Sequence, residues 1–371
     1  MQQLIFDAEV FASCLRAICS DHVKMMKRRK YLHPIEPNLI CNDITREMAD
    51  AMTSAIESNL DIFHEFLKLK ATTLGTEKLL GQDLWAPFPV SDAADRKYSW
   101  EEACKIVGDF FNHFDPEFGE FSRDMFSKGR VDASPRKGKE SGAFCSTDNK
   151  NKSAFILQSF TGNEGDVTTL AHEMGHAIHA YFLTRNQSYF NRQIPMVIAE
   201  TASEFGSKLF NERLVHQSTE KVRKARLLKS LDDLTNVLFE VCSRRRFEEK
   251  LYSAIEKGEY LDAATITRLF KEVREYYFGT GVQFLEEQHY DWIWKPHYYM
   301  ANHRFYNYVY TFAELLVLSL YAKYKVEGAG FIPKFKEFLK VGSANSPIQA
   351  GKEIMGVDLA NKDFWAVGLM E

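Results

Sequence analysis

The chain has 371 residues, of which 45% are hydrophobic and 26% charged, and its formal net charge is −4 at pH 7. This composition is ordinary for a globular protein, and the mildly acidic balance gives no reason to expect a nucleic-acid partner. No apolar run approaches the ~20 residues that span a bilayer, and the first residues lack the layout of a secretion signal. We therefore expect no membrane association and a cytoplasmic location. The six cysteines are scattered without a CxxC pair, so we expect them to be reduced thiols.

Helical periodicity begins near the N-terminus. Apolar residues at helical spacing predict a helix from about Thr45 to Leu69, with its cap at Asn42–Asp43. Two basic runs, Lys24–Lys30 and Arg244–Arg246, have the composition of phosphate sites. We interpret both as solvated helix faces, which is the usual role of such runs.

A pair of short strands is predicted in the middle of the chain. Ser141–Cys145 and Ala154–Phe160 are short and apolar, and the polar segment Ser146–Lys152 between them is typical of a hairpin connection. The expected architecture is therefore a small sheet beside mostly helical scaffolding. Because the strands lie shortly before the next predicted helix, we expect both to wall one cleft.

The next predicted helix carries an HExxH motif. His172 and His176 are one helical turn apart, which places two imidazoles within reach of a single metal ion at ~2.0–2.1 Å. Glu173 follows the first histidine and can take a proton from the attacking water. Asp166 can cap the helix, and another face of it is apolar: Val167, Leu170, Met174, Ile178 and Tyr181.

The alternative to a metal site is a pair of helical histidines that only pack and form hydrogen bonds. The position of the motif inside a well-formed amphipathic helix favours the metal interpretation. Gly175 costs ~1 kcal/mol against alanine in a helix interior, so its presence there also indicates a close backbone approach.

A third metal ligand is needed, and His179 is the nearest candidate along the helix. Seven residues of α-helix separate His172 from His179 by about 10 Å along the axis, so one ion cannot readily bind all three histidines. The metzincin pattern also fails, because it requires a glycine where His179 stands and a histidine where Phe182 stands. We interpret His179 as a packing residue or as an outer neighbour of the ligands.

A carboxylate from a following helix is the better candidate for the third ligand. Val197–Leu209 contains Glu200 and Glu204, four residues apart on one helical face. Two histidines, one glutamate and one open position form a catalytic rather than a structural zinc site. Glu204 could then orient a liganding histidine through its free ring nitrogen. A solvated helix face remains the alternative for both glutamates.

Two further long helices are predicted towards the C-terminus. Glu220–Lys257 has helical spacing with few breakers, and Phe305–Tyr324 is rich in aromatic residues and leucine. The fold expected from these patterns is mainly α, with a small β-sheet that lines the cleft.

At this point the motifs HEMGHAIH and AETAS resemble those of the M3 zinc metallopeptidases, the group of thimet oligopeptidase and oligoendopeptidase F. The oligoendopeptidase F branch is the more similar one. Further segments that resemble this branch follow one another along about residues 80–365: Asp83–Pro87, Pro135–Cys145, Phe155–Thr161, Asp166–His179, Lys295–Tyr310 and Gly356–Trp365. The resemblance implies a zincin-like helical catalytic domain.

The resemblance also implies a ligand set and an opposite wall for the site. By position, one Zn²⁺ would be bound by His172, His176 and Glu200, with Glu173 as the base. The family further places a histidine and tyrosines opposite the zinc, where they polarise the scissile carbonyl and stabilise the oxyanion. The matching residues here are His297, Tyr306 and Tyr310, and His303 with Tyr308 is an alternative register.

The strand pair gains a role from the same resemblance. Enzymes of this kind bind the substrate backbone as an added strand along an exposed sheet edge, and Gly142 and Ala143 are the matching small residues. Such binding gives affinity without sequence dependence. An ordinary hairpin is the alternative for these two residues.

The resemblance has one departure, in length. Relatives in this branch have a helical region before the part that matches Met1, so the N-terminal lobe is expected to be absent. We expect a single catalytic unit over residues 1–371, with a helical flank (1–130), a sheet with the zinc-binding helices (131–215) and a helical part with the His/Tyr segment (216–371). A fragment, a domain and a naturally short member all fit this expectation.

The sequence therefore predicts a zinc-dependent endopeptidase, a metalloprotease that hydrolyses short oligopeptides. One alternative is a peptide-binding remnant without turnover. Another is a carboxypeptidase or dipeptidyl-carboxypeptidase with the same zinc site, which would need a cationic residue to hold the substrate carboxylate. The oligomeric state is left open.

Overall fold

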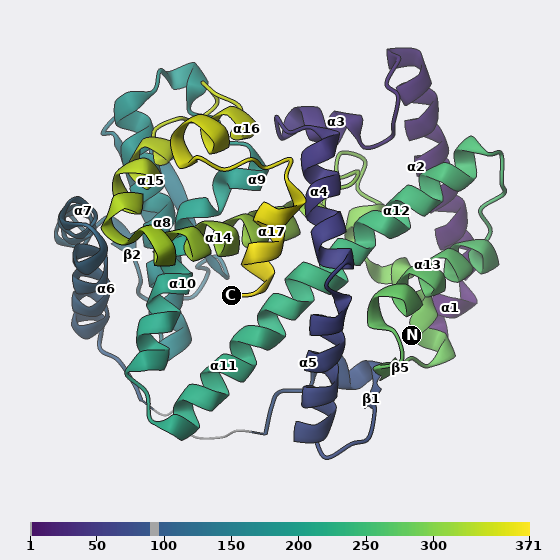
Figure 1. The fold of residues 1–371 in the computed structure, drawn as a ribbon, viewed down its shortest axis with the longest axis horizontal. Helices are drawn as coiled ribbons and strands as arrows, with labels where there is room; N and C mark the ends of the chain where they lie inside the picture. The colour runs from purple at the N-terminus through teal and green to yellow at the C-terminus, as the bar shows by residue number, and fades with distance from the viewer. Residues whose placement is uncertain (1, 90–95) are drawn as a thin grey trace. The chain divides into compact units, whose positions relative to one another are not determined.

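The computed structural model describes residues 2–89 and 96–371, and the described chain forms two compact units (Figure 1). The first unit contains residues up to Pro89 together with Leu228–Phe312, and the second contains the described residues from Arg96 to Leu227 together with Ala313–Glu371. The chain passes between the units within α11 (Glu220–Thr235) and within α14 (Tyr308–Glu327). The predicted single catalytic unit, with its three sections, stays a prediction.

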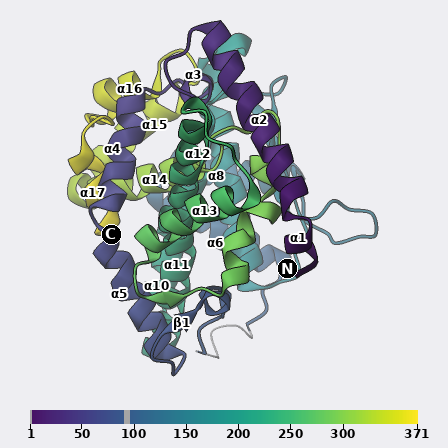
Figure 2. The ribbon, with the colours of Figure 1, turned by 90° about the vertical axis from the view of Figure 1, so that its right-hand side faces the viewer.

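The first unit is built almost entirely of helices. In Figures 1 and 2 helices α12 and α13 lie beside α2, and two short strands pair in parallel through Leu79 with Val282. Its remaining elements complete the unit around them. The bounds are α1 (Gln2–Phe6), α2 (Ala8–Arg29), α3 (Glu36–Cys41), α4 (Arg46–Glu57), α5 (Leu60–Thr73), β1 (Leu79–Leu80), η1 (Gly81–Trp85), η3 (Asn236–Glu240), α12 (Val241–Glu256), α13 (Ala263–Phe278), β5 (Val282–Gln283), η4 (Glu286–Trp294) and η5 (Pro296–Tyr298).

The helix predicted over Thr45–Leu69 is two helices, α4 and α5, which separate at Ser58–Asn59. The cap predicted at Asn42–Asp43 is wrong. Thr45 caps α4, because its hydroxyl accepts the Met48 N–H at 3.4 Å, whereas Asp43 has a left-handed φ of 52° outside the helix.

The arginine triplet of α12 is not the solvated face that the sequence predicted. Arg245 is fully buried and pairs with Asp50 and with Glu249, while Arg246 forms two hydrogen bonds to Glu57. Buried guanidinium groups require such partners. The charged side chains of Lys24–Lys30 on α2, by contrast, are exposed as predicted.

The second unit joins a small sheet to a group of helices. The paired helices α6 and α7 lie against α8, and α10 packs along α8 as well (Figure 1). The bounds are α6 (Trp100–Phe114), α7 (Pro116–Ser127), β2 (Val131–Asp132), β3 (Ala143–Asp148), β4 (Ser153–Gln158), α8 (Glu164–Asn186), η2 (Tyr189–Asn191), α9 (Met196–Ala199), α10 (Thr201–His216), η6 (Gly328–Gly330), α15 (Phe331–Leu339), α16 (Pro347–Ala350), η7 (Gly351–Met355) and α17 (Lys362–Leu369).

The sheet of the second unit contains the predicted hairpin. Strands β3 and β4 pair antiparallel, from Ala143 opposite Gln158 to Asp148 opposite Ser153, and residues 149–152 connect them. Strand β2, which was not predicted, pairs in parallel with β4, so the strand order is β2-β4-β3. Within the described chain β3 is therefore an edge strand. Both β3 and β4 pack on α8.

Helix α8 carries the HExxH motif and is buried on nearly every side. Leu170, Met174 and Ile178 lie in the core on the predicted apolar face. The helix begins earlier than predicted, because Asn163 is the N-cap and the Asp166 carboxylate accepts the Asn163 N–H at 3.2 Å. Asp166 is thus an acceptor within the first turn and not the cap.

Both long helices predicted towards the C-terminus are present, but their bounds differ from those predicted. Glu220–Lys257 is helical from α11 to α12 with one π-helical turn, η3, between them. Helix α14 begins at Tyr308, three residues after the predicted start at Phe305, because Phe305 has a left-handed φ of 54°. A mainly α fold with small sheets confirms the predicted fold class. Among the described residues, no helix has both the length and the apolar character that crossing a membrane requires.

Candidate metal centre and active site

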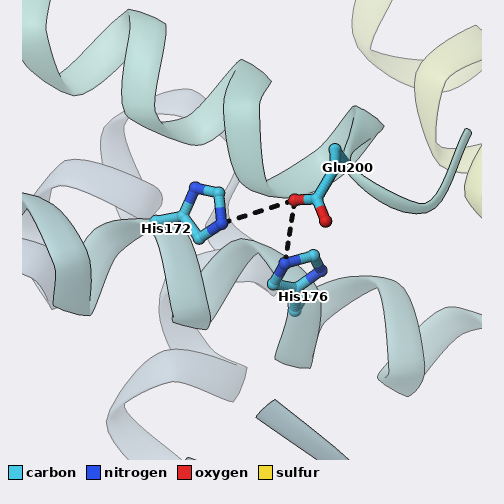
Figure 3. Close-up of side chains that lie close together, drawn as sticks. All are labelled: His172, His176 and Glu200. Carbon is cyan, nitrogen blue, oxygen red and sulfur yellow. Dashed lines mark ion pairs between the residues drawn. The ribbon is translucent and has the colours of Figure 1, made fainter. Parts of the chain in front are cut away.

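Three side chains of the second unit converge on one point (Figure 3). His172 and His176 project from α8 towards the carboxylate of Glu200, which lies between α9 and α10. The Glu200 Oε2 atom is 3.4 Å from His172 Nε2 and 3.1 Å from His176 Nε2. One ligand atom from each of the three residues lies within 4.8 Å of the others.

These distances suit a single tetrahedral ion. Zinc bound at ~2.0–2.1 Å by nitrogen and oxygen ligands separates neighbouring ligand atoms by about 3.3–3.4 Å. The two separations from Glu200 Oε2 to the histidine nitrogens, 3.4 and 3.1 Å, are close to that value. Two imidazoles and one carboxylate also form the donor set of a catalytic zinc site, so the residues present fit the ion.

The close approach of α10 to α8 depends on Gly175. A Cβ atom added there would lie 2.5 Å from the Ala202 carbonyl oxygen and 2.6 Å from Ser203 Cα. Real Cβ atoms are not found so close to backbone atoms, so only glycine permits this crossing. The sequence prediction of a close backbone approach at Gly175 is therefore confirmed.

The sequence predicted that Glu200 lies inside one helix, and this prediction is wrong. Glu200 stands at the junction of α9 and α10 with φ −87° and ψ 0°. This sparsely populated backbone region is frequent at functional sites. The junction lets the Glu200 side chain point at the histidines while Glu204 continues along α10.

Glu173 is the buried carboxylate of the site. Its side chain is 5% exposed, and within the described chain its Oε2 atom has no hydrogen-bond partner. Burial raises the pKa of Glu173, which the positive charges of His176 and His172 partly oppose. A buried carboxylate without a partner has the properties of a general base poised to accept a proton.

The three metal-facing groups influence one another electrostatically. Burial acts to lower the pKa of His172, but the hydrogen bond to Glu200 and the charge of Glu204 outweigh it, so the net shift is upward. Burial acts to raise the pKa of Glu200, but the hydrogen bonds from the two histidines bring it well below its usual range. Glu200 is therefore an anion, as a carboxylate that binds a metal must be.

Further carboxyl groups lie around the ligands. Glu204 Oε1 is 3.6 Å from His172 Nδ1, and burial raises the pKa of Glu204. Burial raises the pKa of Glu314 on α14 to about 8, and the negative charge of Glu204 adds to this shift. Burial also lowers the pKa of Lys208, the cation of this group.

A cavity of about 390 Å³ opens beside the ligands. One wall is the edge strand β3 with Ala143, and another is the α8 face that carries His172, Glu173 and His176. The predicted common cleft of strands and metal helix is thus present. Gly142 directly precedes β3 and has a left-handed φ of 88°, a conformation that favours glycine.

His179 lines this cavity but is not one of the three converging ligands. It is 3% exposed, and its Nδ1 atom has no hydrogen-bond partner among the described residues. Burial lowers the pKa of His179 to about 3, so its ring is neutral at pH 7. Its position agrees with a packing or outer role.

The predicted residues of the opposite wall belong to the first unit and form a cluster of their own. The rings of His297 and Tyr306 stack with centroids 5.5 Å apart, and the Tyr310 hydroxyl lies 3.0 Å from the Tyr306 hydroxyl. His303 packs edge-on against Tyr306. Burial, followed by the charges of Arg244 and His303, lowers the pKa of His297.

The alternative register of His303 with Tyr308 fits this cluster less well. Tyr308 is fully buried, and its hydroxyl donates to Asn38 Oδ1 at 2.8 Å. A tyrosine held in this way serves the core of the first unit. We therefore retain Tyr306 and Tyr310 as the candidate donors.

Sequence reasoning missed two serines at the centre. Ser203 donates to Glu200 Oε2 at 2.9 Å, and Ser207 lies 3.2 Å from His172 Nδ1. Their spacing from Glu200, three and seven residues, was a signal, because both positions share the helix face of Glu200.

Comparisons with known proteins complete the description of the site. The profile of peptidase family M3 matches residues 12–369. The chain belongs to peptidase family M3. Among its relatives, an oligoendopeptidase F homolog of Lactococcus lactis is 27% identical over 358 residues, which are 95% of this chain and 58% of that protein. The predicted oligoendopeptidase F branch is thereby confirmed.

Solved structures have the same fold. A protein from Chlamydophila abortus matches with a TM-score of 0.89 and 23% identity, over 100% of this chain and 62% of the other. Oligoendopeptidase-F from Enterococcus faecium matches with a TM-score of 0.72 and 21% identity, over 98% of this chain and 58% of the other. This family member therefore spans roughly three fifths of the length of such relatives.

Proposed function

We propose that this chain is a zinc-dependent endopeptidase that hydrolyses short oligopeptides. The observation that carries the proposal is the convergence of His172, His176 and Glu200 beside the buried carboxylate of Glu173, whose Oε2 atom has no hydrogen-bond partner among the described residues. A zinc ion held by the three ligands would supply Lewis acidity, which lowers the pKa of water and polarises a carbonyl. The affinity order of divalent metals does not by itself select zinc over manganese or cobalt at these donors, so metal analysis of the purified protein identifies the ion.

Glu173 has the role of the general base in this proposal. Its carboxylate takes a proton from the water that attacks the scissile carbonyl, and then passes that proton to the leaving amine. Burial favours this exchange, because the raised pKa of Glu173 brings its proton affinity closer to that of the groups with which it exchanges protons.

The remaining residues bind and orient the peptide. Strand β3 is an edge strand within the described chain, with Ala143 at its start and Gly142 directly before it, and its edge offers main-chain groups to an extended substrate. His297, neutral because of its lowered pKa, and the hydroxyls of Tyr306 and Tyr310 supply donors for the oxyanion. Each such donor typically contributes about 3 kcal/mol to the transition state.

The test is replacement of Glu173 by Gln, assayed on a quenched fluorescent peptide with bound zinc measured in parallel. We expect kcat to fall by about 10²–10⁴-fold while zinc occupancy stays at the wild-type level, because Gln keeps the shape and loses the base. The matched control is Glu120→Gln on α7, an exposed site in the same unit, which should leave both values unchanged. Retained activity of Glu173→Gln at full zinc loading would remove Glu173 from the mechanism.

Two further measurements separate the proposed activity from the alternative functions. A peptide-binding remnant would bind a hydroxamate-type peptide at full zinc loading and cleave no short peptide. Mass spectrometry of the products of a ten-residue peptide separates an endopeptidase, which cuts internally, from a carboxypeptidase, which releases C-terminal residues. The cytoplasmic location expected from the sequence stays a prediction.

A further inference from the structure

Two side chains of α10 lie within hydrogen-bond distance of His172 and Glu200. His172 offers Nε2 towards Glu200, so its other ring nitrogen, Nδ1, faces away from the ion site. When Nε2 binds a metal, Nδ1 carries the ring proton and needs an acceptor. Which side chain accepts that proton decides the tautomer and the orientation of the ring.

Two side chains of α10 compete for the Nδ1 proton. Ser207 Oγ lies 3.2 Å from His172 Nδ1, whereas Glu204 Oε1 lies 3.6 Å away. A separation of 3.6 Å is too long for a hydrogen bond, and the distance to Ser207 is within the usual range. Ser207 is therefore the partner of the ring, and Glu204 adds only a more distant charge.

Ser203 has the corresponding relation to the carboxylate ligand. Its hydroxyl lies 2.9 Å from Glu200 Oε2, the same oxygen that faces both histidines, and 3.0 Å from the Glu200 carbonyl oxygen. A carboxylate oxygen has two lone pairs, so it can accept one hydrogen bond and still bind an ion. Ser203 is fully buried, and no bulk water competes for this contact.

The two serines reach their ligands in different ways. Ser203 lies three residues after Glu200 on the same segment. Gly175 lets α10 approach α8 so closely that the Ser207 hydroxyl reaches across to His172. Serine hydroxyls in helices often bond only to the carbonyl one turn earlier, and Ser203 has such a contact available. The Ser207 hydroxyl instead contacts His172 on the neighbouring helix α8, and hydrogen bonding within one helix does not explain this contact.

We propose that Ser203 and Ser207, one helical turn apart on α10, are positioning residues that hold Glu200 and His172 in the geometry that binds the metal. This inference rests on the proposed metal site and deepens it. The serines do not touch the substrate; they act through the two ligands. Outer partners of metal ligands typically contribute 10–100-fold to metal affinity.

The experiment measures metal binding directly, in the intact chain, without a peptide. Zinc affinity is determined by competition with a chromogenic chelator, and the Co²⁺-loaded protein gives an absorption spectrum that reports ligand geometry. We expect Ser207→Ala and Ser203→Ala each to weaken zinc binding by about 10–100-fold and to alter the cobalt spectrum. Ser207→Thr keeps a hydroxyl and should restore most of the affinity.

The matched control is Ser122→Ala on α7. Ser122 is also fully buried on a helix and donates to a carbonyl one turn earlier, but it touches no ligand. It should lose some thermal stability and keep wild-type zinc affinity and spectrum. Wild-type affinity and spectrum in both Ser203→Ala and Ser207→Ala would overturn the proposal while the metal site stands. A wild-type chain that binds no zinc would overturn the site and the proposal together.

Discussion

Tyr306 and Tyr310 are coupled through their hydroxyls, which are 3.0 Å apart. If both donate to the oxyanion, the removal of either hydroxyl also disturbs the other. We predict that Tyr306→Phe and Tyr310→Phe each lower kcat by about 10²–10³-fold. The double variant should lose much less than the product of the single effects, because hydroxyls in one network are not additive. Steady-state kinetics of the four proteins on one peptide measures this coupling.

Tyr308→Phe is the control that separates the two registers. The Tyr308 hydroxyl lies in the core and donates to Asn38, so its removal should lower the free energy of unfolding by about 1 kcal/mol. It should leave kcat unchanged. A large loss of kcat in Tyr308→Phe, with Tyr306→Phe near the wild type, would support the other register.

For single residues, the sequence predicts the metal ligands better than it predicts the side chains that form hydrogen bonds with those ligands. The spacing of His172 and His176 is a local property of one helix, and a glutamate on the following segment is a natural third ligand. Ser203 and Ser207 carry only the weaker signal of their spacing from Glu200, because a serine in a helix usually bonds to its own backbone. The contact of Ser207 with His172 depends on the close approach of α10 to α8, which the sequence of α10 does not reveal.

The crossing of α8 and α10 is the element on which the metal site depends. We predict that Gly175→Ala lowers the free energy of unfolding by about 1–3 kcal/mol, because the new Cβ would overlap the backbone at Ala202 and Ser203. The helices would have to separate, so zinc affinity should fall as well. Chemical denaturation and chelator competition measure the two effects.

Gly165→Ala is the matched control for this crossing. Gly165 lies in the first turn of the same helix, and a Cβ added there meets nothing within 4 Å. Alanine should be neutral or slightly stabilising at that site, since it has the higher helix propensity. If Gly175→Ala were as stable as Gly165→Ala and bound zinc normally, close packing at Gly175 would not be needed.

For helices and strands, the sequence predicts that an element is present better than it predicts where the element begins and ends. The helical spacing over Thr45–Leu69 is real, but Thr45 supplies the cap and the pattern continues through a break between α4 and α5. Strand β2 has only two residues, Val131–Asp132, which is too short for any alternation to be visible. Caps and short strands depend on contacts that periodicity does not contain.

At the scale of the molecule, each compact unit combines segments that are far apart in the sequence. Residues up to Pro89 share a unit with Leu228–Phe312, a grouping that local patterns do not reveal. The fold class could be predicted, because it depends only on the content of helix and strand. The candidate ligands and the cluster of His297 belong to different units, a division that the order of the motifs along the chain does not reveal.

Stability of the whole chain should depend on pH through Glu248 on α12. This carboxyl is buried, accepts the Phe305 N–H at 2.8 Å, and thereby connects α12 to the segment before α14. Burial raises the pKa of Glu248 to about 8 from an ordinary 4.5. Between these pH values the folded state retains a proton that the unfolded state loses, so the free energy of unfolding should fall as pH rises. The slope from this one group is at most about 1.4 kcal/mol per pH unit.

Glu248→Gln isolates this contribution, since the amide stays neutral at every pH and can still accept the Phe305 N–H. We predict that the variant loses the Glu248 share of the decline from pH 5 to pH 8 and gains stability relative to the wild type as pH rises. Glu314, whose pKa burial also raises to about 8, keeps its own share of the decline in both proteins. Urea denaturation at one-unit pH intervals measures both curves. Glu256→Gln, an exposed site at the end of the same helix, should keep the wild-type slope. Parallel curves for Glu248→Gln and the wild type would mean that the proton on Glu248 does not contribute to folding.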